Sequence, residues 1–503
     1  MGNNKSSKYT YYIICGICCI FAIYFTSRFS VKWIADPDAA NSPIVWRAFL
    51  HEGFSAFKHW TPTFDNWYFT VYPLNFALFY ILNDDGIAPI VISSAIFIIL
   101  VSILSSKITL RFSGYIPATA ALISITFISP DLYINGYYGH PFSHNSTNAY
   151  GFIALALYFS SLTGEKVFHA ILIGVILLIS SASDPWIQAS FTIPILISEF
   201  YNAYINKERR PYAAILLIAF LLSITNSIQI FFNLPVHGFK ITSLDQMLDN
   251  FERAVILTSK ILPIWVEQNI ILSYFSFVFW MFAFLFSAYT LFKKGGVYSI
   301  ISLFFIMSIL GIYSSSIIGD QLPHQRFYLN VAPVVLITLS ICAHYKRILY
   351  IPIILTLGVS LYAYATTTLN YNTNKNIDEY ITFLKKNDLS YGYGSFWGMN
   401  MTVNWLSKGA LHITPVYFDK KTGFVDFKSV RVQTLATWHT KAFIESQPNR
   451  QFISISKGTS GDRCADIEIC IAGIKKQIGQ PDEILHHSGM TFLVYNIPIK
   501  TNI

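Results

Sequence analysis

The sequence contains few charged residues. Asp, Glu, Lys and Arg make up 12% of its 503 residues, whereas soluble proteins carry roughly a quarter. Hydrophobic residues make up 53%, and apolar stretches close to the ~20 residues that cross a bilayer recur between Thr10 and Ala365. This composition excludes a soluble protein and predicts a polytopic α-helical membrane protein.

Cysteine is also scarce. Six cysteines in 503 residues exclude a disulfide-rich scaffold. Cys464 and Cys470 lie in a polar C-terminal region and can form a disulfide in an oxidising compartment. The others lie in apolar segments, where cysteine packs as a small hydrophobic side chain: Cys15, Cys18, Cys19 and Cys342.

Several motifs of soluble enzymes are absent. The sequence has no Walker GxxxxGK[ST], no GxSxG and no HExxH motif. The glycine-rich run YGYGSFWG at residues 391–398 has no lysine, so it does not read as a nucleotide-binding loop. Nucleotide hydrolysis and zinc proteolysis are therefore not indicated.

The net charge of +8 is concentrated in every second loop between the apolar stretches. Loops with this bias remain cytoplasmic, which predicts a cytoplasmic N-terminus and argues against nucleic acid as a partner. The basic loop residues are Lys5, Lys8, Lys107, Arg111, Lys166, Lys207, Arg209, Arg210, Lys293, Lys294, Lys346 and Arg347.

We expect about eleven spanning helices within residues 1–366, the first an uncleaved anchor. The stretch 69–82, FTVYPLNFALFYIL, is too short to span, so we expect it to lie along the outer membrane surface. The expected spans are 10–28, 87–104, 113–130, 149–162, 167–183, 186–205, 213–231, 271–292, 297–317, 330–344 and 348–366. The expected outer loops are 29–86, 131–148, 232–270 and 318–329.

Residues 367–503 are more polar and alternate helical and strand patterns. They predict a small α/β domain on the outer side of the membrane. IDEYITFLKKN and MTVNWLSKG read as helices; LSYGYGSF, LHITPVYF, QFISIS and MTFLVYNI read as strands.

The outer loops carry the candidate chemistry. Asp36 and Asp38 follow the first span, where a partly desolvated carboxylate can act as a general base. They can equally cap the next short helix. Glu52 and Asp65 are competing acids in the same loop, which also contains the aromatic Trp67.

The second outer loop contains Asp131, His140, His144 and Asn145. Its histidines could ligate a metal, but no cysteine or zinc-motif spacing accompanies them, and the mix of side chains favours binding of sugar hydroxyls. Asp184 can begin the next helix, or bind sugar together with Trp186 and Gln188 beside it.

Arg326 lies in the loop GDQLPHQRFYLN before the tenth expected span. An arginine there can hold a phosphate by forked hydrogen bonds or simply extend to the membrane surface. Positive charge is otherwise kept out of short outer loops, which favours the phosphate role. His324 and Lys240 are further candidates for that role.

The segments TFDNWYFTVYPLNFALF, HQRFYLN and SYGYGSFWGMNMTVNWLSKGALHITPV occur in this order. With the basic first anchor, the acidic and aromatic first outer loop and the exported tail, they resemble integral-membrane glycosyltransferases of the GT-C fold. The closer resemblance is to bacterial serotype-converting O-antigen glucosyltransferases.

The resemblance implies an enzyme of the bacterial inner membrane with a periplasmic C-terminal domain. It would transfer a sugar, with glucose expected, from a polyprenyl-phosphate donor to a glycan such as lipopolysaccharide O-antigen, inverting the anomeric carbon. Asp36 or Asp38 would be the base, and Arg326 would hold the donor phosphate. No metal or other cofactor is implied.

Three alternatives remain. A structural membrane anchor with a binding tail would not need four polar outer loops. An O-antigen polymerase or ligase is also polytopic and uses lipid-linked substrates, but such proteins rely on arginine-rich outer loops. A transporter or flippase of lipid-linked glycans should place ionisable residues within its spans, whereas here they gather at the span ends.

Overall fold

The computed structural model describes residues 5–30, 36–135, 138–162, 167–236, 238–267, 269–368, 373–459 and 462–501. Its contacts divide the chain into two compact units. The helical unit comprises residues 1–30, 64–74 and 91–369, and the α/β unit comprises residues 31–63, 75–90 and 370–503.

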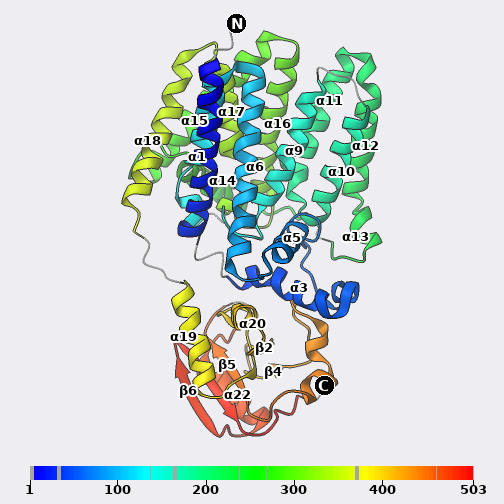
Figure 1. The fold of residues 1–503 in the computed structure, drawn as a ribbon, viewed down its shortest axis with the longest axis vertical. Coiled ribbons are helices and arrows are strands. Elements are labelled where there is room, and N and C mark those ends of the chain that lie inside the picture. The colour runs from blue at the N-terminus through cyan, green and yellow to red at the C-terminus, as the bar shows by residue number, and fades with distance from the viewer. Residues whose placement is uncertain are drawn as a thin grey trace. The chain divides into compact units, whose positions relative to one another are not determined.

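The long helices of the helical unit run alongside one another (Figure 1). Every one of the expected spans contains a helix. Helices α8 and α14 lie in expected outer loops. The helices are α1 (Lys5–Phe29), α6 (Ile87–Ser113), α7 (Tyr115–Thr126), α8 (Asp131–Ile134), α9 (His144–Ser161), α10 (Val167–Ser183), α11 (Ile193–Ile205), α12 (Arg210–Ile224), α13 (Ser227–Phe231), α14 (Leu244–Ile261), α15 (Ile270–Lys294), α16 (Val297–Ile318), α17 (Val331–Ala343) and α18 (Tyr350–Thr366). Short 3-10 turns lie at Lys207–Arg209, Gln325–Tyr328 (η5) and Arg347–Leu349, and a π-helical turn (η3) at Gln188–Thr192.

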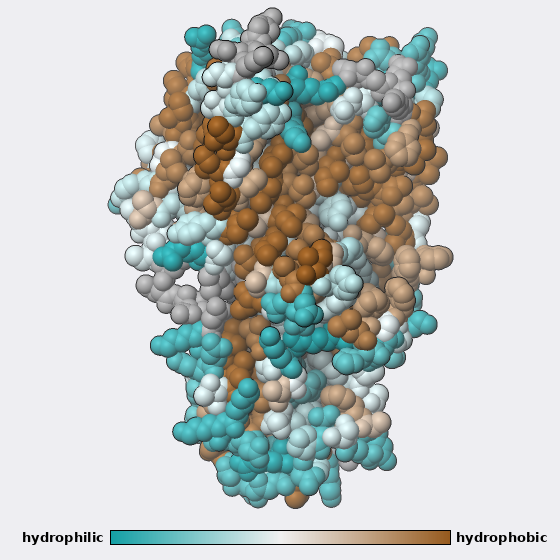
Figure 2. Space-filling model, in the orientation of Figure 1, coloured by the Kyte–Doolittle hydropathy of each residue, from teal (hydrophilic) through white to brown (hydrophobic). Residues whose placement is uncertain are grey.

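The chain is a helical membrane protein. Within the described residues, six helical segments are long and apolar enough to cross a bilayer. Hydrophobic side chains cover much of the visible face of the helical unit (Figure 2). The other expected spans fall on shorter helices, so the number of about eleven stays a prediction. The six segments are Ser6–Phe29, Ile87–Ser113, Ile270–Lys294, Val297–Ile318, Gln325–Ala343 and Arg347–Thr366.

The stretch expected to lie on the membrane surface forms helix α5 (Tyr72–Leu82). Its 11 residues correspond to about 16 Å at 1.5 Å per residue, roughly half of the hydrocarbon core. This length does not by itself distinguish a surface helix from a buried one, so the place of α5 on the membrane surface stays a prediction.

Close helix packing holds the turn η3 against α16. A side chain at Gly311 would place its Cβ 2.1 Å from the carbonyl oxygen of Ala189, so only glycine fits there. Ser308 Oγ donates to the carbonyl of Ser190 at 2.7 Å. Small residues commonly allow such contact between membrane helices, and a π-helical turn often marks a functional position.

The α/β unit is built on a five-stranded sheet in the order β2-β1-β5-β7-β6. Strand β1 is parallel to β2 and β5, and β7 is antiparallel to β5 and β6. The strands are β1 (Tyr391–Gly394), β2 (His412–Pro415), β5 (Gln451–Ser456), β6 (Glu483–His487) and β7 (Met490–Tyr495), with a separate pair β3 (Tyr417–Phe418) and β4 (Val425–Asp426).

Helices cover both faces of this sheet. Phe452 of β5 packs with Tyr380 and Val403 of two helices, whereas Ile453 beside it packs with Ile474 of a third, because neighbouring strand residues face opposite sides. The helices of the unit are α3 (Asn41–Glu52), α4 (Ala56–His59), α19 (Thr373–Lys386), α20 (Asn400–Leu406), α21 (Lys441–Glu445) and α22 (Ile467–Ile478). Three 3-10 turns are η1 (Pro37–Ala40), η2 (Gly53–Ser55) and η7 (Ala436–His439).

The α/β unit includes more than the expected domain 367–503. Arg47 of α3 forms a two-point ion pair with Asp85, at 2.5 and 2.9 Å, and also donates to the carbonyl of Asn404. Trp405 Nε1 donates to the carbonyl of Asp85 at 2.5 Å. Much of the first outer loop is therefore part of this unit. The sequence did not predict this, because the contacts join residues that are far apart in the chain.

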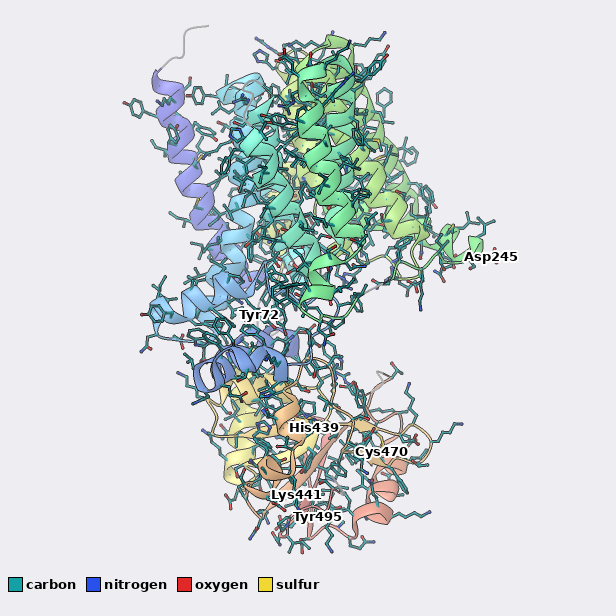
Figure 3. The ribbon with its side chains drawn as sticks, turned by 90° about the vertical axis from the view of Figure 1, so that its right-hand side faces the viewer. Tyr72, Asp245, His439, Lys441, Cys470 and Tyr495 are labelled. Atoms are coloured by element: carbon teal, nitrogen blue, oxygen red, sulfur yellow. A yellow bond between two sulfur atoms is a disulfide. The ribbon has the colours of Figure 1, made fainter. Side chains whose placement is uncertain are left out.

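The helices and strands expected from the C-terminal sequence are present, except that LHITPVYF is divided between β2 and β3; α21, α22, β4 and β6 were not expected. Cys464 and Cys470 form a disulfide, with Cα atoms 6.3 Å apart, that ties the segment before α22 to that helix. Cys470 is labelled in Figure 3 together with His439 and Tyr495 of the same unit.

Candidate functional site

The helical unit contains a cavity of about 530 Å³ at one end of its helices. Its wall is formed by the start of α9, the turn between α10 and η3, the end of α16, and η5. The polar and aromatic lining residues are Phe64, Asp65, His144, Asp184, Trp186, Gln188, Asn226, Phe239, Ser315, Ser316, Asp320, Gln321, Arg326 and Phe327.

His144 and Asp184 form a buried pair in this wall. His144 Nδ1 lies 2.5 Å from Asp184 Oδ2, and Thr147 Oγ1 donates to the same oxygen at 2.5 Å. The imidazole is 10% exposed and the carboxylate 3%. His144 Nε2 is buried and has no hydrogen-bond partner among the described residues.

Local sequence explains how the pair is positioned. Ser143 caps α9 by accepting from the backbone N–H of Asn145, so His144 starts the helix and Thr147 lies one turn later on the same face. Asp184 follows the last residue of α10, and its Oδ1 accepts from the backbone N–H of Trp186 at 3.0 Å. The carboxylate thus turns the chain into the next helix, as expected, and also binds His144.

Asp184 is ionised in this setting. Burial alone would raise the pKa of its carboxyl group, but the charge and hydrogen bond of His144, with the bonds from Thr147 and Trp186 N–H, hold that pKa below its usual value. An ionised carboxylate only accepts hydrogen bonds, so His144 Nδ1 must carry the proton between the two groups.

Aromatic rings surround the imidazole. The ring of Trp186 lies 5.4 Å from that of His144, Phe327 lies 5.3 Å from it, and the two aromatic rings are 4.9 Å apart. Trp186 and Phe327 also line the cavity. Exposed aromatic faces stack on the C–H face of sugars and on cations.

Arg326 lines the same cavity from η5. Its guanidinium lies 5.2 Å from the ring centre of Phe327. It makes no hydrogen bond or ion pair to any other residue that the structure describes. An arginine with five unused N–H donors beside a cavity is a ready site for an anion.

The loop that carries Arg326 is held by hydrogen bonds to its backbone. The backbone N–H of Asp320 donates to Lys240 O at 3.1 Å, and that of Thr242 donates to Ile318 O at 2.9 Å. Arg253 Nε donates to the carbonyl of Pro323 at 2.7 Å. These bonds fix the turn, while Lys240 itself is exposed and does not line the cavity.

Asp65 is placed at the cavity by its neighbours. Asn66 Nδ2 donates to Ala182 O at 2.8 Å, and the backbone N–H of Phe69 donates to Ser183 Oγ at 3.0 Å. Trp67 is buried against Phe142 with a positive φ of 62°, which is rare for a bulky residue. Trp67 therefore shapes the segment and does not line the cavity.

Asp36 and Asp38 belong to the α/β unit. Asp36 Oδ1 accepts from the backbone N–H of Asp38 at 2.7 Å and caps η1, the structural role anticipated for one of them. Asp38 Oδ1 accepts from Gln433 Nε2 at 2.8 Å. Oxygens of the two carboxylates lie within 4.8 Å of each other.

The remaining sequence candidates lie outside the cavity. Glu52 pairs with His59 at 2.6 Å on the surface of the α/β unit. His140 Nδ1 accepts from Phe142 N–H, and Asn145 Nδ2 donates to the carbonyl of Tyr138, so both stabilise their loop.

Two further candidates, Asp131 and His324, are held near the turn that precedes α17. Asp131 accepts hydrogen bonds from Asn135 and Gln325. His324 is half-buried; burial, with the charges of Arg326 and Arg253, lowers its pKa to about 4. It is therefore neutral at pH 7 and does not supply a positive charge for a phosphate.

Sequence reasoning missed three residues that bind the candidates: Thr147, Phe327 and Gln433. Thr147 lies three residues after His144 in α9, a helical spacing that could have suggested a shared partner. Phe327 is adjacent to Arg326. Gln433 is 395 residues from Asp38, and no local pattern could have connected them.

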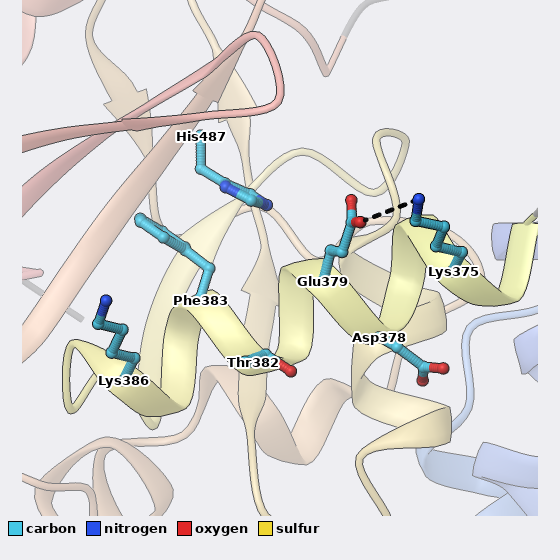
Figure 4. A pocket seen from close by; sticks show the side chains of 7 residues that line it. All are labelled: Lys375, Asp378, Glu379, Thr382, Phe383, Lys386 and His487. Carbon is cyan, nitrogen blue, oxygen red and sulfur yellow. Dashed lines mark ion pairs between the residues drawn. The ribbon is translucent and has the colours of Figure 1, made fainter.

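The α/β unit has a hollow of about 720 Å³ along α19 (Figure 4). The rings of Phe383 and His487 stack there, 4.4 Å apart, and Lys375 and Glu379 form an ion pair at 3.8 Å. These two charged side chains are 70% and 53% exposed. Their ion pair is therefore a solvated surface contact, and we do not assign a binding site to this hollow.

No protein-family model matches this chain, and no curated protein sequence is significantly similar to it.

Proposed function

We propose that this protein is a membrane glycosyltransferase that moves a sugar from a polyprenyl-phosphate donor to a glycan acceptor. The observation that carries the proposal is the position of the Arg326 guanidinium, which has no hydrogen-bond partner among the described residues. It lines a cavity that also contains the His144–Asp184 pair and Trp186. A cation, an aromatic face and carboxylates in one cavity match a phosphate joined to a sugar.

The location of the cavity supports a lipid-linked donor. It lies at the last turn of α16, whereas Lys293 and Lys294 lie just before the first turn of that helix. If the basic end is cytoplasmic, the cavity opens at the outer membrane surface. In a bacterium this is the periplasmic face of the inner membrane, where O-antigen is available as acceptor.

The chemistry requires a base and a stabilised leaving group. The acceptor hydroxyl loses its proton to a first-loop carboxylate and attacks the anomeric carbon, while the bond to the phosphate oxygen breaks with inversion. Arg326 stabilises the negative charge on the departing polyprenyl phosphate. Asp38 is our first choice as base, because Asp36 already caps η1.

The test is a transfer assay with purified protein, polyprenyl-phosphate glucose and a lipopolysaccharide acceptor. We expect transfer that withstands a metal chelator, is lost in Asp38→Asn, and falls in Arg326→Gln through weaker donor binding. Surface Asp249→Asn is the matched control and should retain full activity. Full activity in Asp36→Asn, Asp38→Asn and the double variant would exclude the mechanism.

The alternatives predict different products. A polymerase or ligase would join preformed glycan chains without consuming the single-sugar donor. A flippase would move the donor across proteoliposomes without forming any glycosidic bond. Either result, in the absence of sugar transfer, would replace the proposal.

A further inference from the structure

The helical unit contains a second cavity, of about 380 Å³, that has no lining residue in common with the one beside Arg326. Its wall is formed by α8, the end of α14 with the residues that follow it, and the last turns of α18. Helix α18 belongs to a segment that is long and apolar enough to cross a bilayer, and Lys346 and Arg347 precede its first turn. If that basic end is cytoplasmic, the second cavity lies at the outer membrane surface.

An apolar stripe on α18 leads from this cavity toward the middle of the bilayer. Leu355, Val359 and Tyr362 recur at intervals of four and three residues, so they lie on one face of the helix. Leu355 and Tyr362 are exposed, and Val359 and Tyr362 line the cavity. Tyrosine is common where a spanning helix reaches the lipid headgroups. The stripe therefore fits a lipid whose chains lie along Leu355 and whose headgroup lies at the cavity.

Two opposite charges line the cavity beside this stripe. Lys260 comes from the last turn of α14 and Asp131 is the first residue of α8, and these two helices pack against each other. Lys260 is exposed and makes no hydrogen bond or ion pair to any other residue that the structure describes, so the three donors of its ammonium group are available. Asp131 accepts from Asn135 at one carboxylate oxygen and from Gln325 at the other, and each oxygen can accept a second hydrogen bond.

Because Lys260 and Asp131 are not paired with each other, a ligand that carries both charges can lie between them. A lipid headgroup with a phosphate and an amine is such a ligand, and basic pockets between spanning helices bind lipid headgroups. A purely anionic headgroup would bring like charge to Asp131, which is unfavourable. A quaternary amine has no N–H to donate to the carboxylate. The charges therefore favour a headgroup with a primary amine.

We propose that the second cavity binds one phospholipid of the outer leaflet whose headgroup ends in a primary amine, as in phosphatidylethanolamine. Lys260 donates to the lipid phosphate, and Asp131 accepts from the lipid ammonium. An acyl chain lies along Leu355 and Val359. The site is separate from the cavity beside Arg326, and the inference does not rest on the proposed function.

The test measures lipid binding to the full-length protein in detergent by native mass spectrometry. The probes are the dioleoyl forms of phosphatidylethanolamine, phosphatidylcholine and phosphatidylglycerol, which share their acyl chains and differ in headgroup. We expect the wild type to bind phosphatidylethanolamine about tenfold more tightly than either of the others, as for one charge-assisted hydrogen bond. Lipid that only coats the apolar helices would show no such preference.

Two variants separate the roles of the charged side chains. Lys260→Gln should weaken binding of phosphatidylethanolamine about tenfold, because the phosphate loses its cation. Asp131→Asn keeps the shape of the side chain and should remove the preference for phosphatidylethanolamine over phosphatidylglycerol. Lys207→Gln, at an exposed lysine between α11 and α12, is the control and should bind all three lipids as the wild type does.

Equal affinity of the wild type for the three lipids, or unchanged binding of phosphatidylethanolamine in a folded Lys260→Gln protein, would overturn the inference. A wild-type preference for phosphatidylglycerol would overturn it as well, because the site would then belong to an anionic lipid. Should Asp131→Asn fail to fold, two measurements decide: the lipid preference of the wild type, and its loss in Lys260→Gln, a change at an exposed side chain.

Discussion

Asp184 accepts a hydrogen bond from His144 at 2.5 Å across 40 residues of sequence. The pair joins the end of α10 to the start of α9, and both residues face the cavity. Because the carboxylate of Asp184 is buried against a histidine, the stability of this part of the fold depends on whether that carboxylate is ionised.

The first prediction concerns Asp184→Asn. The change leaves a buried imidazole without its anionic partner, so we expect a loss of about 2–3 kcal/mol in unfolding free energy. The folded carboxyl has a pKa below its usual 3.8, so it stabilises the fold above about pH 4 and loses that effect as pH falls through the folded pKa. Thermal melts should therefore show a deficit at pH 7 that narrows below pH 4. Asp249→Asn, on the exposed face of α14, should melt as the wild type does.

The second prediction concerns His324. Its folded pKa of about 4 lies below the usual histidine pKa of 6.5, so the unfolded chain binds more protons between these values. Wild-type stability should be complete above about pH 6.5 and fall between pH 6.5 and 4. His324→Gln cannot be protonated, so its melting temperature should fall less over that window. Identical slopes in the two proteins would mean that another group causes the loss.

Much of the helical architecture could be predicted from sequence, because apolar stretches and basic loops are local signals. The strands β1, β5 and β7 could be predicted for the same reason. Strand β6 was missed because its EILHH residues are largely exposed and lack the alternation of a half-buried strand. The number of spans is not determined, since helices such as α7 and α11 are too short to decide by length.

The candidate site could be predicted only in part. Asp65, His144, Asp184 and Arg326 were singled out separately, and the structure brings them to one cavity. Their grouping depends on how α9, α10 and α16 pack, which no local pattern encodes. For the same reason the pairing of Asp38 with Gln433 could not be foreseen.

The third prediction concerns Trp186 as a sugar platform. Removal of its indole in Trp186→Ala should raise the KM for the sugar donor about tenfold, since stacked aromatic contacts contribute about 1 kcal/mol or more. Binding of farnesyl phosphate, which has no sugar, should not weaken. Trp265→Ala is the matched control, because Trp265 is 43% exposed and lies outside this cavity. An unchanged KM in Trp186→Ala would remove the stacking role.

The fourth prediction tests whether Asp38 is oriented by the α/β unit. Gln433 Nε2 donates to Asp38 Oδ1 at 2.8 Å, and the Gln433 backbone is fixed by its N–H bond to Thr61 O at 2.6 Å. If Asp38 is the base, Gln433→Ala should lower kcat about tenfold, the equivalent of one hydrogen bond, and leave KM for the donor unchanged.

A stricter variant is Gln433→Glu, which places a second negative charge beside Asp38. It should lower kcat further and shift the lower limb of the pH–rate profile to higher pH, because a like charge disfavours ionisation of the base. Gln447→Ala is the control: among the residues that the structure describes, the side-chain amide of Gln447 bonds to the nearby Phe443 and Ser446, and this variant should keep wild-type kcat. If Gln433→Glu kept the wild-type pH–rate profile, Asp38 would not be the base, and Asp36 would be tested next.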